Sequence, residues 1–166
     1  MASADRDDEV DLLIDAWSRR LPEVDLTPLD VMSRLRRVSH RLTRLRAGAF
    51  NGAGLASWEF DVLAALRRTE PPHELSPAQL IGATMIGSAA MSNRLDKLSG
   101  RGLIERRPND VDRRSVIVQL TDDGAARVDA AMTELVRREA IELREVSDAD
   151  QAHLARILRH MLDTDS

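Results

Sequence analysis

The sequence predicts a mostly α-helical protein with one small β-hairpin, and three observations support this fold class. Apolar residues recur three and four positions apart through most of the 166 residues, as they do in amphipathic helices. Two short helical stretches joined by a tight turn occupy residues 76–99. Two strand-like segments separated by a polar loop follow at residues 103–120, an arrangement that is typical of a hairpin.

The first two helices are expected to precede this region. An N-terminal helix is expected over residues 9–21, where Pro22 ends it. Its apolar residues share one face: Val10, Leu13, Ile14, Trp17 and Leu21. A long helix over residues 29–48 follows, with Thr27 as its cap and Pro28 at its first position. Its inward-facing residues are expected to be Met32, Leu35, Val38, Leu42 and Leu45.

A winged helix-turn-helix is expected over residues 57–120. Ser57 should cap its first helix, and Ser76 and Gln79 have the spacing of a capping box that opens the second. After a turn at residues 84–87, a third helix buries one face and leaves the other polar. The buried set is Met91, Leu95 and Leu98. The polar set is Ser88, Ser92, Asn93, Arg94 and Lys97.

Two helices are expected after the hairpin, capped by Thr121 and Ser147. Together with the helix at 29–48, the segment 121–163 has more apolar surface than one small domain can cover. Mutual burial in a two-fold homodimer is the least costly way to cover these stripes, so both segments are expected to form a dimerisation region. The length favours a single domain over residues 1–166.

The charge of the chain is unevenly distributed. The formal net charge is −4. Residues 1–30 contain nine acids and three arginines, whereas residues 31–50 contain six arginines and no acid. Residues 87–120 contain seven bases and four acids. A polyanion that approaches within a Debye length would therefore meet local basic surfaces on an acidic protein.

Several classes of function are not expected. The chain has no cysteine, which excludes disulfides and thiolate metal sites, and its four histidines have no convincing ligand spacing. Neither a metal nor a cofactor is expected. No apolar run reaches the ~20 residues that cross a bilayer, and the N-terminus is acidic, so a cytoplasmic protein without a membrane partner is expected. No nucleophile–base pair or phosphate loop suggests an enzyme.

The segment RGLIERRPNDVDRRSVIVQLTDDG, residues 101–124, resembles the wing of the MarR family of bacterial transcriptional regulators, with Asp112 and Arg114 as the family's Asp-x-Arg. The resemblance covers about residues 29–163. It implies a homodimer on double-stranded operator DNA, with one helix in the major groove and a wing arginine in the minor groove. The candidate DNA-contacting residues are Ser88, Ser92, Asn93, Arg94, Lys97, Arg113 and Arg114.

The chemistry of these residues agrees with that resemblance. Asparagine and arginine side chains hydrogen-bond to base edges in the major groove, where a good bidentate pair contributes ~1–3 kcal/mol of discrimination. Arg113 and Arg114 suit a narrow and electronegative minor groove. On helical spacing alone, Arg94 and Lys97 would equally fit a solvated face.

A second and narrower resemblance concerns the ligand. The N-terminal helix with its tryptophan is similar to that of the urate-responsive branch of the family, whose ligand residues are matched here by Trp17, Asp61, Arg94 and Arg106. A planar purine anion needs a π-face and a guanidinium, which Trp17 and Arg106 could supply. Repulsion of Asp61 by the anion would then reorient Arg94. On residue patterns alone, Trp17 also fits a core anchor, and Asp61 an acid favoured by the helix dipole.

Two alternatives remain open at this point. One is a regulator of the same family that answers phenolic or antibiotic-like ligands. The other is a helical protein-interaction module that does not bind DNA. The salt dependence of DNA binding separates the two classes, because a dimer that neutralises phosphates loses affinity steeply as salt rises.

Overall fold

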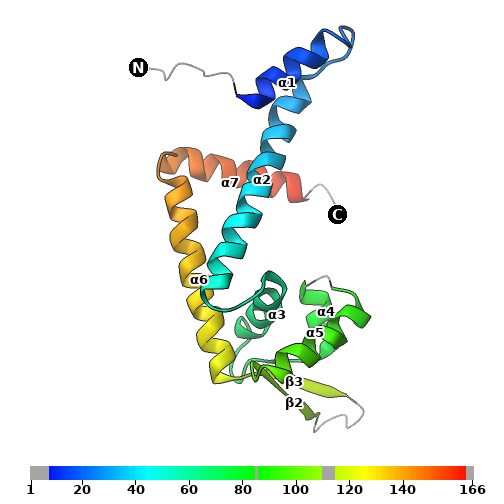
Figure 1. The fold of residues 1–166 in the computed structure, drawn as a ribbon, viewed down its shortest axis with the longest axis vertical. Coiled ribbons are helices and arrows are strands. Elements are labelled where there is room, and N and C mark those ends of the chain that lie inside the picture. Colours follow the sequence, from blue (N-terminus) through cyan, green and yellow to red (C-terminus); the bar gives the residue numbers. More distant parts are fainter. Residues whose placement is uncertain (1–7, 85, 110–114, 164–166) are drawn as a thin grey trace. The chain divides into compact units, whose positions relative to one another are not determined.

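The computed structural model describes residues 8–84, 86–109 and 115–163, and it confirms the predicted fold class (Figure 1). Seven helices and three strands lie within these ranges. Their bounds are α1 Glu9–Ser18, α2 Thr27–Gly52, α3 Ser57–Arg67, β1 Glu74–Leu75, α4 Pro77–Thr84, α5 Ser88–Gly100, β2 Ile104–Pro108, β3 Val116–Leu120, α6 Asp122–Leu143 and α7 Asp148–Asp163. The chain divides into two compact units, residues 1–45 and 46–166, and the boundary falls within α2.

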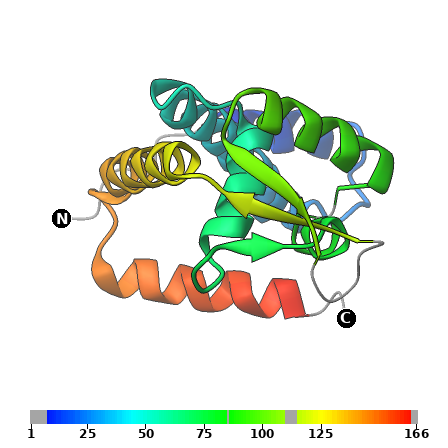
Figure 2. The same ribbon diagram turned by 90° about the horizontal axis from the view of Figure 1, so that it is seen from below.

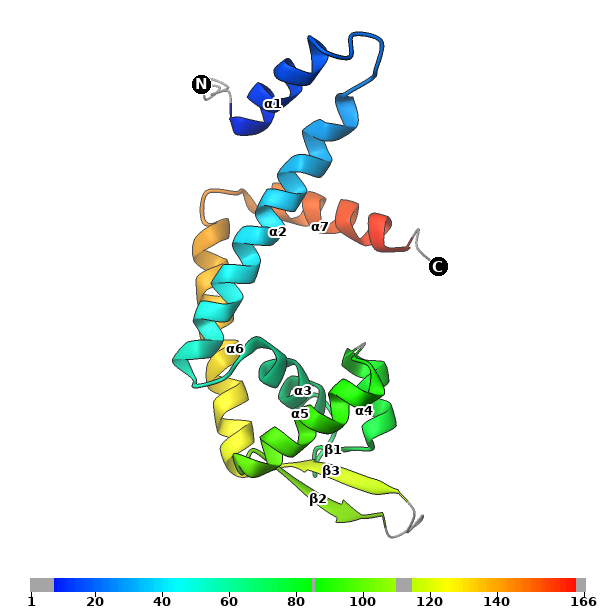
Figure 3. The ribbon, with the colours of Figure 1, turned by 45° about the vertical axis from the view of Figure 1, so that its right-hand side comes forward.

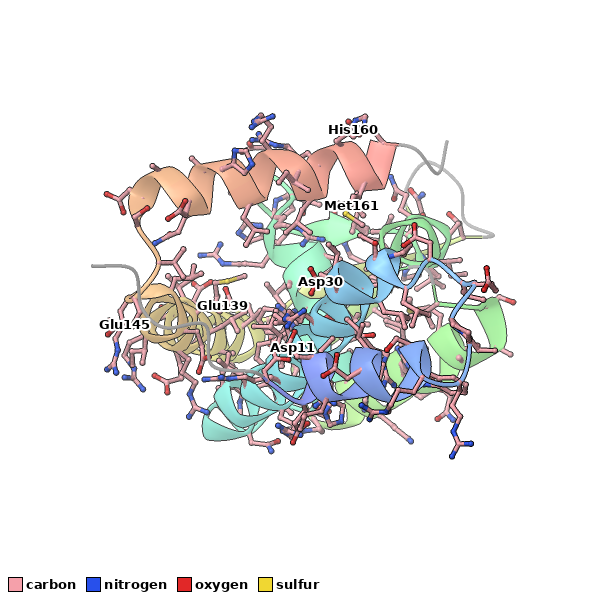
Figure 4. The ribbon with its side chains drawn as sticks, turned by 90° about the horizontal axis from the view of Figure 1, so that it is seen from above. Asp11, Asp30, Glu139, Glu145, His160 and Met161 are labelled. Carbon is pink, nitrogen blue, oxygen red and sulfur yellow. The ribbon has the colours of Figure 1, made fainter. Side chains whose placement is uncertain are left out.

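In the first unit, ion pairs join α1 to the first half of α2. The Arg34 guanidinium contacts Asp8 at 2.9 Å and Asp11 at 2.8 Å, and it also pairs with Asp30. Figure 4 shows Asp11 and Asp30 approaching from the two helices. The hydrogen bond from Arg34 is the main reason why the pKa of Asp11 lies below its ordinary value. The acids at the start of α1 therefore have a structural partner within the arginine-rich stretch.

The second unit is built around a three-stranded antiparallel sheet in the order β1-β3-β2. Figures 2 and 3 show the hairpin running alongside α5. The short strand β1 was not predicted; it pairs Glu74 with Gln119 and Leu75 with Val118. Two residues are too few to show the alternation that identifies a strand in a sequence.

The core of the second unit joins α3, α4, α5 and the sheet. Leu63 and Leu66 of α3, Leu80 of α4 and Leu98 of α5 are fully buried. At the end of α2, the ring of Phe50 stacks on that of Phe60, with 3.9 Å between their centroids. This core fixes the position of α5 and leaves its other side free for solvent.

Three predicted caps are present. Ser76 and Gln79 form the reciprocal capping box, Thr121 Oγ1 accepts a hydrogen bond from Gly124 N at 3.0 Å, and Ser147 Oγ accepts one from Asp150 N at 3.2 Å. Gly124 is required where it stands, because a Cβ there would lie 2.2 Å from the carbonyl oxygen of Leu103. This close approach brings the start of α6 against the beginning of the hairpin.

Two predicted caps are wrong. Ser57 and Thr27 are the first residues of their helices and not the caps before them. At α3 the carboxylate of Glu59 accepts the N–H of Ala56 at 2.9 Å, and at α2 Asp25 accepts the N–H of Thr27 at 2.9 Å. In both cases the carboxylate of a nearby acid, and not a serine or threonine hydroxyl, accepts a backbone N–H at the start of the helix that has no partner within the helix.

The helices expected to form the dimerisation region expose apolar side chains in the single chain. In the first unit, Met32 and Val38 were expected to face inward and are each 52% exposed. In the second unit α7 has no buried residue. Its exposed apolar residues are Leu154, Ile157 and Leu162. Across the described residues, no helix is both long and apolar enough to cross a membrane.

Candidate functional site

The helix α5 presents a polar face that the core holds in place. Met91, Leu95 and Leu98 are buried as the sequence predicted, and α5 contacts both α4 and β2. Ser88, Ser92, Asn93 and Lys97 are exposed, and Arg94 is half-buried. Since residues advance by about 100° around a helix, Asn93 lies about 200° from Met91 and faces directly away from the core. We call α5 the recognition helix, after the role that the family resemblance predicts for it.

Arg94 does not extend freely into solvent. Its guanidinium carbon lies 5.5 Å from the centroid of the Trp58 ring, a geometry that favours a cation–π interaction. Trp58 is a half-buried residue near the start of α3. The sequence had not marked Trp58 as a functional residue, because its contact with Arg94 joins two helices that are distant in sequence.

Arg106, on the first strand of the wing, contacts the recognition helix directly. Its Nη1 atom lies 2.9 Å from Oδ1 of Asp96, and its Nη2 approaches the carbonyl oxygen of Ser92 at 3.5 Å. Asp96 was not among the predicted site residues. Because Arg94 and Asp96 are about 200° apart around the helix axis, the side chain of Arg94 leaves α5 on the flank opposite the one that Arg106 contacts.

The other two predicted ligand residues are exposed. Asp61 lies on α3, three residues after Trp58 and therefore on the same side of that helix. Within the described ranges Asp61 shows no hydrogen bond or ion pair with Arg94 or Arg106. Trp17 belongs to the first unit, where it lies on α1 with 47% of its surface exposed.

The two wing arginines, Arg113 and Arg114, lie outside the described residues, as does Asp112. The strands that lead to them are well paired. Pro108 is opposite Val116, and the N–H of Asn109 donates to the carbonyl of Ser115 at 3.0 Å. Both ends of the wing loop therefore start from a closed hairpin.

An ion pair between a buried glutamate and an exposed arginine fixes the end of the recognition helix. Glu59 is 4% exposed, and its Oε2 atom accepts hydrogen bonds from Ala56 N at 2.9 Å and from Arg101 Nη1 at 2.5 Å. A second Arg101 nitrogen donates to the carbonyl of Gly54 at 2.8 Å. Because Arg101 directly follows α5, this network holds that end of the helix to the start of α3.

The part of the chain that the structure describes shows no candidate metal site. No group of three or more histidine or acidic side chains is arranged to hold a metal ion there. The described polar groups on α5 and β2 are an amide, hydroxyls, an ammonium, guanidinium groups and the carboxylates of Asp96 and Glu105.

Comparison with known proteins identifies the family. The MarR family model matches residues 53–115, which run from just before α3 into the hairpin. The transcriptional regulator PecS of Dickeya dadantii is 37% identical over 150 residues, covering 90% of each chain. The chain belongs to the MarR family. It is a DNA-binding transcriptional regulator of that family, and its relatives are named as regulators and not as enzymes.

Solved structures of the family share the fold. A mutant of Escherichia coli MarR in complex with operator DNA matches with a TM-score of 0.69 and 25% identity, covering 84% of this chain and 99% of that one. Bordetella bronchiseptica BpsR, described as regulated in its DNA binding by 6-hydroxynicotinic acid, matches with a TM-score of 0.67 and 27% identity. That match covers 80% of this chain and 93% of BpsR.

Proposed function

We propose that this MarR-family protein is a repressor that binds a pseudo-palindromic operator as a homodimer and leaves it when a small anionic ligand binds. Urate is the candidate ligand. The observation that supports this most is the contact of Arg106 with the recognition helix, 2.9 Å from Asp96. An anion that binds Arg106 would act one contact away from the helix that reads DNA.

DNA reading is assigned to the recognition helix and the wing. Asn93 faces away from the core, where its amide can pair with a base edge. Ser88, Ser92 and Lys97 are exposed beside it and can meet bases or phosphates. The wing arginines Arg113 and Arg114 are assigned to the minor groove.

The homodimer is supported by the exposed apolar residues of α6 and α7. Within the second unit, Val136 of α6 is 57% exposed and Leu154 of α7 is 47% exposed, values that are unusual for residues on apolar stripes of a monomer. A two-fold dimer would place two recognition helices on half-sites roughly 10 bp apart.

The resemblance implies four ligand residues, of which Asp61, Arg94 and Arg106 lie in the second unit and Trp17 lies in the first. Trp17 offers an exposed π-face. Arg106 offers a guanidinium, and its side chain is 30% exposed. Asp61 is a carboxylate that an incoming anion would repel. Similarity to PecS over most of the chain supports this branch of the family, and the BpsR match supports a small aromatic acid as the competing ligand class.

Fluorescence anisotropy of a labelled operator tests this function. Addition of urate to the protein–DNA complex should release the DNA, whereas xanthine should act more weakly because it carries less negative charge at neutral pH. Salicylate and 6-hydroxynicotinate test the competing class. Release by these acids but not by urate would reassign the ligand. Operator binding that does not weaken as salt rises would contradict a DNA contact that neutralises phosphates.

A further inference from the structure

We propose that Asp96 is the counter-ion of Arg106 in the DNA-binding state, and that an anionic ligand acts by taking Arg106 away from it. The ligand then leaves an unpaired carboxylate on the recognition helix, close to the DNA phosphates. Asp96 is a positioning residue in this account, since it acts through Arg106. The inference rests on the proposed function for the identity of the ligand, but not for the pairing of the two residues.

The geometry links two elements that both belong to the DNA-binding surface. Arg106 lies on β2, at the base of the wing, and Asp96 lies on the third turn of α5. Their 2.9 Å contact, with the approach of Arg106 Nη2 to Ser92, is a direct polar connection between wing and recognition helix. A change at Arg106 is therefore transmitted to α5 without an intermediate residue.

The pair is open enough for a ligand to compete. The Asp96 side chain is 65% exposed and the Arg106 side chain is 30% exposed. Exposed ion pairs are weak, and they change an equilibrium by only about 2- to 5-fold. A planar anion that meets the guanidinium with two parallel hydrogen bonds, and also stacks on an aromatic ring, can replace the single contact to Asp96.

The consequence for DNA follows from charge. An acid on a helix that enters the major groove lies within a Debye length of several phosphates. While Arg106 pairs with Asp96, the two charges cancel locally. When an anion occupies Arg106, Asp96 becomes an uncompensated negative charge that repels the backbone, and the ligand adds its own charge nearby.

The surroundings of Asp96 supply a matched control. Lys97 follows it in sequence but points about 100° away around the helix. Glu105 precedes Arg106 on β2, and alternate residues of a strand face opposite sides, so its carboxylate points away from the side that contacts α5. Glu105→Gln therefore removes the same charge one residue from Arg106 without removing the ion pair.

The first experiment needs no ligand. Arg106→Gln should weaken operator binding by about 2- to 5-fold, because it leaves Asp96 unpaired at the DNA surface. Adding Asp96→Asn to this variant should recover most of the lost operator affinity, whereas adding Glu105→Gln should recover less of it. Anisotropy with the same operator measures all four proteins. Equal rescue by Asp96→Asn and Glu105→Gln would overturn the proposal, since only general charge would then matter.

The second experiment uses urate. Asp96→Asn should bind urate about 2- to 5-fold more tightly, because the competitor for Arg106 is gone, yet urate should weaken its DNA binding less than it weakens that of the wild type. A loss of structure would not raise ligand affinity and lower coupling together. If urate neither binds the wild type nor weakens its DNA binding, the proposed ligand is wrong. The operator-binding comparison of the Arg106→Gln variants still decides the role of Asp96. Unchanged urate affinity and coupling in Asp96→Asn would overturn the displacement step.

Discussion

The guanidinium of Arg94 lies over the ring of Trp58, 5.5 Å from the ring centroid. This contact joins the recognition helix to α3 on the flank opposite Arg106. Arg94 is thus held by an aromatic face, and Asp61 lies one turn further along the same side of α3. A displacement of Arg94 would begin from this stacked position.

The first expected outcome concerns that pair. Trp58→Leu and Arg94→Gln should each lower the free energy of unfolding, and the double variant should lower it by about 0.5–1 kcal/mol less than the sum, the usual strength of a cation–π contact. Urea denaturation followed by circular dichroism measures the three variants. Additive losses would show that the stacking contributes nothing. Trp58 cannot be treated as silent background in fluorescence experiments, because it touches Arg94.

The second concerns base reading. Asn93→Ala should lower the preference for operator over scrambled DNA by ~1–3 kcal/mol, since we assign the reading of base edges to its exposed amide. Arg114→Ala should instead weaken binding to both DNAs more evenly, because a minor-groove arginine responds to shape and charge. Competition assays with the two DNAs give the ratio. An unchanged ratio for Asn93→Ala would mean that another face of α5 meets the bases.

The third concerns the dimer. Ile157→Glu places a charge on the exposed apolar stripe of α7 and should convert the dimer to a monomer at micromolar concentration. Arg159→Glu puts the same charge about 200° further around α7 and should leave the dimer intact. Sedimentation equilibrium distinguishes these states. A wild type that already sediments as a monomer would rule out the two-fold arrangement on DNA.

The fourth concerns pH. The hydrogen bond from Arg34 holds the pKa of Asp11 below its ordinary value. A lowered pKa in the folded state means that the contribution to stability is complete above the unfolded pKa, roughly 3.9, and is lost as pH falls toward the folded value. The attachment of α1 to α2 through Arg34 should therefore loosen only below about pH 4.

Fluorescence of Trp17 in a Trp58→Phe background follows this transition, because Trp17 lies on α1. Asp11→Asn should loosen α1 already at neutral pH. Asp15→Asn is the matched control on the same helix, since Asp15 forms no ion pair among the described contacts. Loosening of equal size in both variants would refute the role of Arg34.

Much of the fold could be predicted because local and tertiary requirements agree. The spacing of Met91, Leu95 and Leu98 identified the buried face of α5, and Thr121 identified the start of α6. Ser57 was wrongly predicted as a cap, because a serine before a helix and a serine at its first position look alike in sequence. The partner that takes the Ala56 N–H is the buried carboxylate of Glu59.

The site was predicted less completely, because its contacts join residues that are distant in sequence. Trp58 and Arg94 are 36 positions apart and meet only when α3 packs near α5. Asp96 looked like one more solvated acid of a polar helix face. The role of Asp96 depends on the register of β2 beside α5, because that register places Arg106 next to the Asp96 carboxylate. No pattern within either element contains that information.

The most direct test of the account is the reciprocity between urate and DNA. Isothermal titration should give a measurable affinity of the free protein for urate and a weaker one for the operator-bound protein. The ratio of the two must equal the factor by which saturating urate weakens operator binding, because coupling between two ligands is symmetric. Equal urate affinities with and without operator would contradict release by urate, as would the absence of any binding at millimolar urate.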